Sequence, residues 1–396
     1  MGYSPSVCDP GAYYKTVNHQ VVCILLVYVD DILIACAHQH TASEFKTALS
    51  SFVNIKDLQS CRHILGISVR RDDKGVYLSQ SSMIQQLLTD YNLQNCRPVS
   101  VPITASYMQG HHWSGGVDNA AGAHSGGAHS TALVSPGSVG TGVYNQQLTS
   151  QECSSQKDSG RSSAVLNKLH SLKVSTGLVA DHSPSPDSNS KQSNIQLSCM
   201  LSAKEQSTYQ SILGVLLYIS TCTRPDISFT VSVLCRKMKQ ANKEDMQALT
   251  HLLRYMQGSK EAELPLGTKV AGLTGYSDAS FADCRQSRRS SAGYLFSFMG
   301  GVVSWRSNLQ KTVALSTAES EYMSLSAAAQ EGIYLRELTT ELKLFAFGNN
   351  DSGTGVATVQ RSDNSKQKMI HSFELATDNQ AAISITEQNS PTSRSK

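Results

Sequence analysis

A pair of adjacent acids between two apolar runs constrains the fold of this chain more than any other feature. Asp30 and Asp31 follow the run at residues 21–27 and precede the run at 32–35. Runs rich in β-branched residues that meet at a turn signal are typical of a β-hairpin. Such a hairpin would carry both carboxylates at its tip. Magnesium prefers carboxylate oxygens together with substrate phosphates, so the pattern favours a nucleotidyl-transfer site.

Residues 27–34, Val-Tyr-Val-Asp-Asp-Ile-Leu-Ile, resemble the Tyr-x-Asp-Asp motif of reverse transcriptases, in the form found in copia-type LTR retrotransposons. The resemblance implies that Asp30 and Asp31 are catalytic, that Asp30 binds metal, and that Tyr28 contacts the substrate. The alternative is an acidic turn without chemistry, because aspartate is common in turns.

Composition sets broad limits on the class of protein. A length of 396 residues with 40% hydrophobic residues allows two or three domains with real cores. The net charge of +3 is nearly neutral, so a basic surface would have to come from local patches. The ten cysteines include no Cys-x-x-Cys pair, which argues against a zinc ribbon and favours reduced thiols in a reducing compartment.

Targeting signals are also missing from the sequence. No stretch has transmembrane length and the start lacks a secretory apolar segment, so we expect an intracellular protein, cytoplasmic or nuclear, without a membrane partner. Residues 6–15 resemble an internal stretch of the family, and Met1 is therefore interpreted as a start inside a longer reading frame.

Residues 1–103 are predicted to form a strand, the hairpin, a helix at 41–52, strands near 63–69 and 76–78, and a helix at 79–91. The last helix has an apolar face formed by Met83, Ile84, Leu87 and Leu88. By resemblance this part is a reverse transcriptase palm remnant and thumb. Residues 63–67 resemble a primer-grip strand, which implies that Gly66 contacts the substrate; an ordinary core strand is the alternative.

Residues 104–200 differ in kind, because Gly, Ser, His, Asn and Gln dominate them. We predict a low-complexity flexible insertion. Its histidines at 111, 112, 124 and 129 have no second ligand type at fixed spacing, so composition bias explains them better than a metal site. Residues 201–270 are predicted to form a helical connection. Its cations Arg236, Lys237, Lys239 and Lys243 fit a solvated helix face better than a phosphate contact.

Residues 271–396 change to short strands followed by a long helix at 313–344, a last strand at 371–377 and a closing helix. A mixed sheet with a helix across it would gather three acids at one edge: Asp278, Glu319 and Asp378. Two divalent ions roughly 4 Å apart need several such carboxylates. Glu319 could instead form a capping box with Ser316, and Asp378 could be a plain N-cap. Glu321 lies roughly 200° around the helix from Glu319, so it is expected to face elsewhere.

This order of motifs resembles the RNase H domain of copia-type elements. The resemblance rests on residues 275–280, 288–294, 304–305, 314–322 and 378–382. It implies that Asp278, Glu319 and Asp378 are catalytic and bind Mg²⁺, with Mn²⁺ as an alternative. The predicted fold class is α/β (α+β): a truncated palm and thumb, a helical connection, and an RNase H-like mixed sheet with helices.

The family pattern has further acids that this sequence lacks, an earlier palm Asp and a last RNase H acid, so the enzyme question stays open. The first hypothesis is part of a retrotransposon Pol polyprotein with residual metal-dependent hydrolysis of RNA in RNA–DNA hybrids. Its partners would be a hybrid or primer–template and the rest of the polyprotein. The alternative is a non-catalytic nucleic-acid-binding or decayed retroelement remnant.

Overall fold

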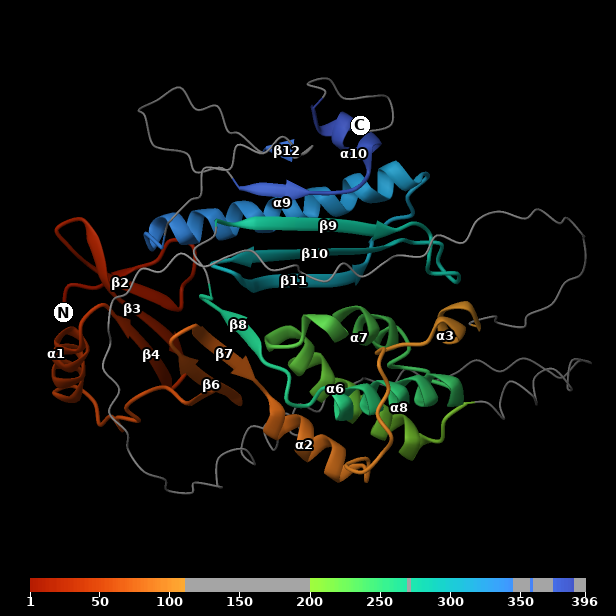
Figure 1. Ribbon diagram of the computed structural model, residues 1–396, viewed down its shortest axis with the longest axis horizontal. Coiled ribbons are helices and arrows are strands. Elements are labelled where there is room, and N and C mark those ends of the chain that lie inside the picture. Colours follow the sequence, from red (N-terminus) through yellow and green to blue (C-terminus); the bar gives the residue numbers. More distant parts are fainter. Residues whose placement is uncertain (111–199, 269–271, 345–356, 359–372, 388–396) are drawn as a thin grey trace, which may run out of the picture.

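The structure is a computed structural model that describes residues 1–110, 200–268, 272–344, 357–358 and 373–387. These residues form three β-sheets with helices packed beside them (Figure 1). The mixed α/β class expected from the sequence is therefore confirmed. Most of the expected insertion at 104–200, including its histidines, lies outside the described residues. At its start, however, α3 (Ala105–Gly110) forms a short helix that was not predicted.

The first sheet contains the predicted hairpin. Its strands, in spatial order, are β1 (Ser4–Pro5), β2 (Ala12–Val17), β3 (Gln20–Tyr28) and β4 (Asp31–Cys36). Helix α1 (Gln39–Ser50) covers one face, where Phe45 packs on Cys23 and Leu25. The hairpin prediction is confirmed, because Tyr28 pairs with Asp31 at its end.

Cys23 and Cys36 are opposite each other on β3 and β4, and the structure joins them in a disulfide. The expectation that the cysteines are reduced is wrong for this pair. Their distance along the chain hid the fact that hairpin register makes them cross-strand neighbours.

The second sheet joins distant parts of the chain. Its order is β5 (His63–Ile64), β6 (Ile67–Asp72), β7 (Gly75–Ser79) and β8 (Leu264–Leu266). The single strand predicted near 63–69 is wrong, because Leu65 and Gly66 have φ values of +52° and +75° and turn the chain between β5 and β6. Two consecutive residues with positive φ are typical of a type I′ hairpin turn.

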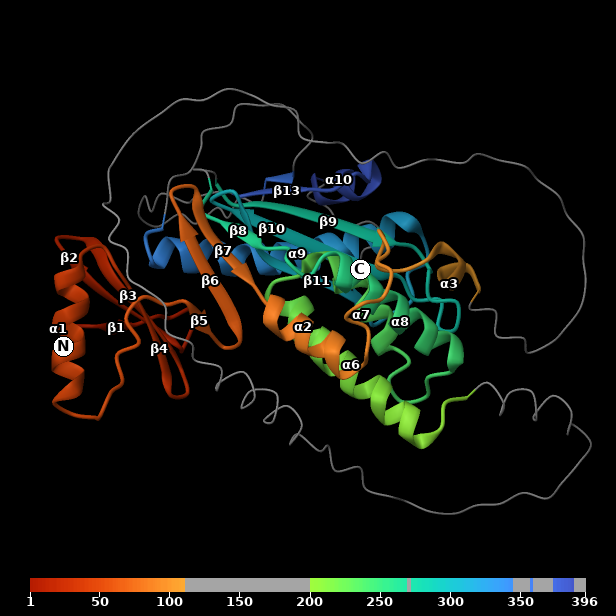
Figure 2. The same ribbon diagram turned by 60° about the horizontal axis from the view of Figure 1, so that its bottom comes forward.

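A helical layer packs beside these sheets (Figure 2). It contains α2 (Ser81–Asp90), α6 (Ala203–Cys222), the 3₁₀ turn η1 (Pro225–Ile227), α7 (Ser228–Cys235) and α8 (Lys243–Gly258). The predicted apolar face of α2 is buried as expected, and it shares one core with the three later helices. Among the described helices, none has both the length and the apolar character needed to cross a membrane.

The third sheet carries the C-terminal acids. Its order is β11 (Gly301–Leu309), β10 (Ser291–Phe298), β9 (Thr274–Ser280), β13 (Glu374–Ala376) and β12 (Ala357–Thr358). Strand β13 runs parallel to β9, whereas the other neighbours are antiparallel, so the predicted mixed sheet is confirmed. Helix α9 (Thr317–Glu341) crosses one face, and α10 (Gln380–Glu387) closes the chain's described part (Figure 1).

Helix α9 starts later than the sequence pattern suggested. Ser316 is its N-cap, because the Ser316 hydroxyl accepts a hydrogen bond from the Glu319 backbone. Leu315 therefore lies before the helix and is 85% exposed, so the predicted helix start at residue 313 is wrong. The apolar face that packs on the sheet includes Leu325, Ala328 and Leu335.

Among the contacts that tie α9 and its sheet to the rest of the chain, two involve single side chains far apart in the sequence from their partners. The carboxylate of Glu341 accepts hydrogen bonds from the Ser6 hydroxyl at 2.7 Å and the Val7 backbone at 2.8 Å. The indole N–H of Trp305 on β11 donates to the Ser220 carbonyl of α6 at 2.7 Å. Trp305 therefore has a structural role.

Close approach of α9 to the sheet depends on two glycines. A Cβ atom on Gly332 would lie 2.2 Å from Phe373 Cε2 and 3.0 Å from Phe296 Cε1. A Cβ atom on Gly275 of β9 would lie 2.4 Å from Phe296 Cε1. Phe296 and Phe373 are both fully buried, so these rings cannot swing out into solvent at no cost. The missing side chains at Gly275 and Gly332 therefore set the distance between helix and strand.

We expect Gly332→Ala to lower the free energy of unfolding by about 1–2 kcal/mol, because the overpacking cost exceeds the helix propensity that alanine gains. Gly214→Ala in α6 is the matched control. No atom lies within 4 Å of its added Cβ, so alanine there should stabilise by about 0.5–1 kcal/mol. Urea unfolding of both variants measures the difference, and equal effects would contradict this account of the packing.

Candidate metal centre

Three carboxylates from different elements meet at one end of the third sheet. One side-chain oxygen each from Asp278, Glu321 and Asp378 lies within 4.8 Å of the others. Asp278 belongs to β9, Glu321 to the first turns of α9, and Asp378 to the segment between β13 and α10. Asp278 and Asp378 are exposed, whereas Glu321 is buried.

Strand register explains why the two aspartates meet. Parallel pairing places Ala376 of β13 beside Tyr276 of β9. Asp378 follows Ala376 by two residues, and Asp278 follows Tyr276 by two residues. The two aspartates therefore lie at the same end of the sheet. Asp278 lies two residues before the end of β9, and not at the strand end that the sequence suggested.

Helix α9 adds the third carboxylate through its contact with β9. The Ser324 hydroxyl lies 2.8 Å from the Asp278 carbonyl, to which it donates, and 3.1 Å from the Ser277 hydroxyl. Glu321 lies one helical turn before Ser324, on the same face of α9. The hydrogen bonds of Ser324 therefore fix both the helix position and the approach of Glu321 to Asp278.

The cluster has more negative charge than its surroundings compensate. Glu321 is 6% exposed, and its Oε2 atom has no hydrogen-bond partner. Burial raises the pKa of Glu321 to about 7, with further increases from the charges of Asp278 and Asp378, against a lowering effect from the Ala279 backbone. An unpartnered oxygen on a buried carboxylate is costly unless a cation balances its charge. Oxygen donors of this kind fit a hard divalent cation.

Glu319, the residue expected from the sequence, takes no part in this cluster. Its carboxylate accepts a hydrogen bond from the Leu315 backbone at 2.7 Å, and its own backbone donates to Ser316 at 3.1 Å. Only the Ser316 half of the predicted capping box is present, because the Glu319 carboxylate bonds to the Leu315 backbone and not to the Ser316 backbone. The expectation that Glu321 faces elsewhere is wrong. The two glutamates are separated by roughly 200° around the helix, and it is Glu321 that faces the cluster.

A signal for Glu321 was present in the sequence. Glu321 precedes Leu325, Ala328 and Leu335 by 4, 7 and 14 residues, and these three are buried against the sheet. That spacing places Glu321 on the buried face of the helix.

Asp378 is not the N-cap of the last helix, which was the alternative to a role in the metal site. The side chain of Asn379 accepts a hydrogen bond from the Ala382 backbone at 2.9 Å, and so caps α10 in its place. Asp378 is exposed and lies with the other two acids.

The hairpin acids lie at a separate, exposed turn. Asp30 and Asp31 follow Val29, whose φ of +55° is unusual for a β-branched residue and indicates a strained turn. The side chain of Tyr28 is exposed beside them. Among the described residues, no third acid, histidine or cysteine gathers with these aspartates.

Gly66 lies in the turn between β5 and β6, beside Met83 of α2. The hydroxyl of Tyr218 donates to the carbonyl of the neighbouring Leu65, which attaches this turn to α6. The substrate contacts assigned to Tyr28 and Gly66 stay predictions.

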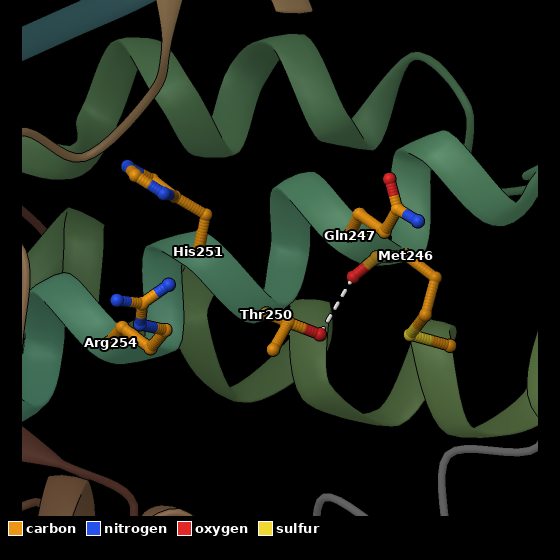
Figure 3. A pocket seen from close by; sticks show the side chains of 5 residues that line it. All are labelled: Met246, Gln247, Thr250, His251 and Arg254. Atoms are coloured by element: carbon orange, nitrogen blue, oxygen red, sulfur yellow. Dashed lines mark hydrogen bonds between the residues drawn. The ribbon is translucent and has the colours of Figure 1, made fainter. Parts of the chain in front are cut away.

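A hollow of about 330 Å³ lies along α8 and is lined by Met246, Gln247, Thr250, His251 and Arg254 (Figure 3). Three of its polar side chains have structural partners. Thr250 donates to the Met246 carbonyl, the His251 ring lies 3.0 Å from the Val101 carbonyl, and Arg254 donates to the Arg97 carbonyl. The contacts of His251 and Arg254 therefore attach the segment after α2 to α8.

Comparison with known proteins places the chain among retroelement proteins. Residues 1–105 match the family described as reverse transcriptase (RNA-dependent DNA polymerase). The chain is 29% identical over 344 residues to the retrovirus-related Pol polyprotein from transposon TNT 1-94 of Nicotiana tabacum, which covers 86% of this chain and 20% of that protein. It is 25% identical over 343 residues to the corresponding polyprotein from transposon RE1 of Arabidopsis thaliana, covering 86% of this chain and 17% of that one.

A shorter relative matches more closely. Secreted RxLR effector protein 161 of Plasmopara viticola is 45% identical over 136 residues, which cover 34% of this chain and 96% of that protein. No solved structure matches the chain. The chain spans a fifth or less of the two polyproteins' length, but most of the chain takes part in those matches. Residues 1–105 therefore match the reverse transcriptase family, and most of the chain is similar to retrotransposon Pol polyproteins.

Proposed function

We propose that residues 271–396 form an RNase H-like domain that hydrolyses the RNA strand of an RNA–DNA hybrid with the help of a divalent metal. The observation that carries this proposal is the meeting of Asp278, Glu321 and Asp378, with an unpartnered oxygen on buried Glu321. Retrotransposon Pol relatives make nucleic acid the natural substrate class. Mg²⁺ is the proposed ion, and Mn²⁺ would fit the same oxygens.

The three residues would hold the ion in different ways. Glu321 is fixed by the packing of α9, so it supplies a carboxylate whose position costs little entropy on binding. The exposed carboxylates of Asp278 and Asp378 leave one side of the cluster open to a long polymer. When bound, a divalent ion activates water and stabilises the charge of a leaving oxygen.

For residues 1–105 we propose a role in the polymerase site of the larger Pol protein. Asp30 would bind metal, Asp31 would assist it, and Tyr28 and Gly66 would contact the primer–template. The strained turn at Val29 and the exposure of Tyr28 support this role, because strained backbone clusters at functional sites. Further ligands would come from other parts of the polyprotein, since the described residues gather none with Asp30.

Hydrolysis of a labelled RNA–DNA hybrid in Mg²⁺ tests the nuclease proposal directly. We expect Asp278→Asn and Glu321→Gln to lower the cleavage rate by about a hundredfold or more, because each removes a charged ligand. Glu319→Gln, the matched control on the same helix, should keep most of the activity. Cleavage that survives Asp278→Asn would refute the assignment. Binding without turnover by the unaltered chain would favour the non-catalytic alternative.

Metal binding can be measured without any catalysis. At a Mg²⁺ or Mn²⁺ concentration about thirtyfold above Kd, binding should stabilise the fold by about 2 kcal/mol and raise Tm by several degrees. Glu319→Gln should show the same rise, and Glu321→Gln should show little or none. Equal rises in both variants would exclude Glu321 as a ligand.

The raised pKa of Glu321 also predicts how metal-free stability depends on pH. The carboxyl titrates near 7 in the folded protein and near 4.5 when unfolded, so between these values the folded state holds the extra proton. The free energy of unfolding should therefore fall as pH rises from about 4.5 to 7, by about 1–3 kcal/mol from this group. Urea unfolding in EDTA at several pH values measures the effect.

Glu321→Gln provides the control for that pH series. The difference in stability between the variant and the unaltered chain should grow in favour of the variant up to about pH 7 and then level off. A difference that does not change with pH would show that burial of Glu321 carries no such cost.

A further inference from the structure

A group of cations without ion-pair partners lies at the same end of the third sheet as the acids. Arg285, Arg288 and Arg289 belong to the loop between β9 and β10, and Lys311 follows β11; we call these four residues the basic rim. None of the four has an ion pair within the described part of the chain. Arg285, Arg288 and Lys311 are exposed, and Arg289 is half-buried.

Strand pairing places the basic rim next to the acidic cluster. The loop leaves β9 at Ser280, two residues after Asp278, and returns at Ser291, which pairs with Ser280. Ser291 also pairs with Leu309 near the end of β11, and the Gln310 backbone donates to the Ser290 carbonyl at 2.8 Å. Figure 1 shows β9 pointing toward this loop, on the side where α9 begins.

The loop that carries the arginines is closed by its own hydrogen bonds. The Cys284 backbone donates to the Arg289 carbonyl at 3.1 Å, and the Arg288 backbone donates to the Cys284 carbonyl at 2.6 Å. The Ser290 hydroxyl accepts from the Ala282 backbone at 3.0 Å. A preorganised loop loses little entropy when it binds a ligand.

The single acid of this loop does not cancel the charge of the rim. Asp283 accepts hydrogen bonds from the backbone and hydroxyl of Ser291 at 2.7 and 2.5 Å, and it forms an ion pair with Arg236 of the helical layer at 3.9 Å. Arg236 in turn donates to the Ser291 hydroxyl at 2.7 Å. Asp283 is paired with Arg236 and bonded to Ser291, so it anchors the loop and does not form an ion pair with the rim.

We propose that the basic rim binds the backbone phosphates of a nucleic acid whose scissile bond lies at Asp278, Glu321 and Asp378, an inference that rests on the proposed nuclease function. Three carboxylates alone would repel a polyanion, and unpaired cations beside them offset that repulsion. Arginine is well suited to phosphate because its guanidinium donates two parallel hydrogen bonds. Contacts to phosphate carry no sequence information, so binding should be independent of sequence.

Binding to a labelled RNA–DNA hybrid in EDTA, over a series of KCl concentrations, tests the rim separately from catalysis. We expect the double variant R285Q/R288Q to weaken binding by about tenfold and to reduce the salt slope, the change of log K with log[KCl], by about two. Hybrids of different sequence should lose affinity equally. R285K/R288K should restore much of the salt slope, because lysine keeps the charge.

K204Q/K239Q is the charge-matched control, because Lys204 and Lys239 are exposed cations without an ion pair in the described part of the chain and lie outside both the third sheet and residues 1–105. It should leave affinity and slope nearly unchanged. Unaltered binding by R285Q/R288Q, or an equal loss in K204Q/K239Q, would overturn the inference.

The same experiment separates the inference from the proposed function. Asp278→Asn should bind the hybrid as well as the unaltered chain does while losing cleavage. Rim-dependent binding without cleavage by any form would refute the nuclease function but keep the phosphate-binding surface. Cleavage that depends on Asp278 but not on the rim would refute this inference alone.

Discussion

The packing of α9 on the third sheet is the constraint on which the candidate metal centre depends. Gly275 and Gly332 allow the rings of Phe296 and Phe373 to fill the space between helix and strands. With the helix at that distance, Ser324 reaches the Asp278 carbonyl and Glu321 is buried beside Asp278. The favourable free energy of apolar packing thus offsets the cost of burying the Glu321 carboxylate.

The same third sheet also organises the rest of the described chain. Glu341 at the far end of α9 holds the backbone at Ser6 and Val7, and Trp305 of β11 contacts α6. Strand β8 pairs with β7 of the reverse transcriptase match. Because β8 lies outside residues 1–105, the part of the chain that matches reverse transcriptases completes its second sheet with a later segment.

The spacing of apolar residues predicted secondary structure correctly where a single strand pair or helix could be considered alone. The apolar runs around Asp30 and Asp31 predicted the hairpin, and the face from Met83 to Leu88 predicted the buried side of α2. It failed where a short turn interrupts an apolar run, as at Leu65, and where a capping residue sets the start of a helix, as at Ser316. Turns and caps depend on single residues, so an average over a window hides them.

The sequence by itself determined that acids from two strands and one helix belong to a mixed sheet, because strand and helix periods are visible in a single segment. Only the tertiary structure decided that Glu321, and not Glu319, meets Asp278 and Asp378, since the rotation of α9 follows from its contacts with β9. The Cys23–Cys36 pair and the basic rim beside the acids likewise depend on strand register. Register brings residues of different strands together, and the partner of a strand is not visible within that strand's own segment.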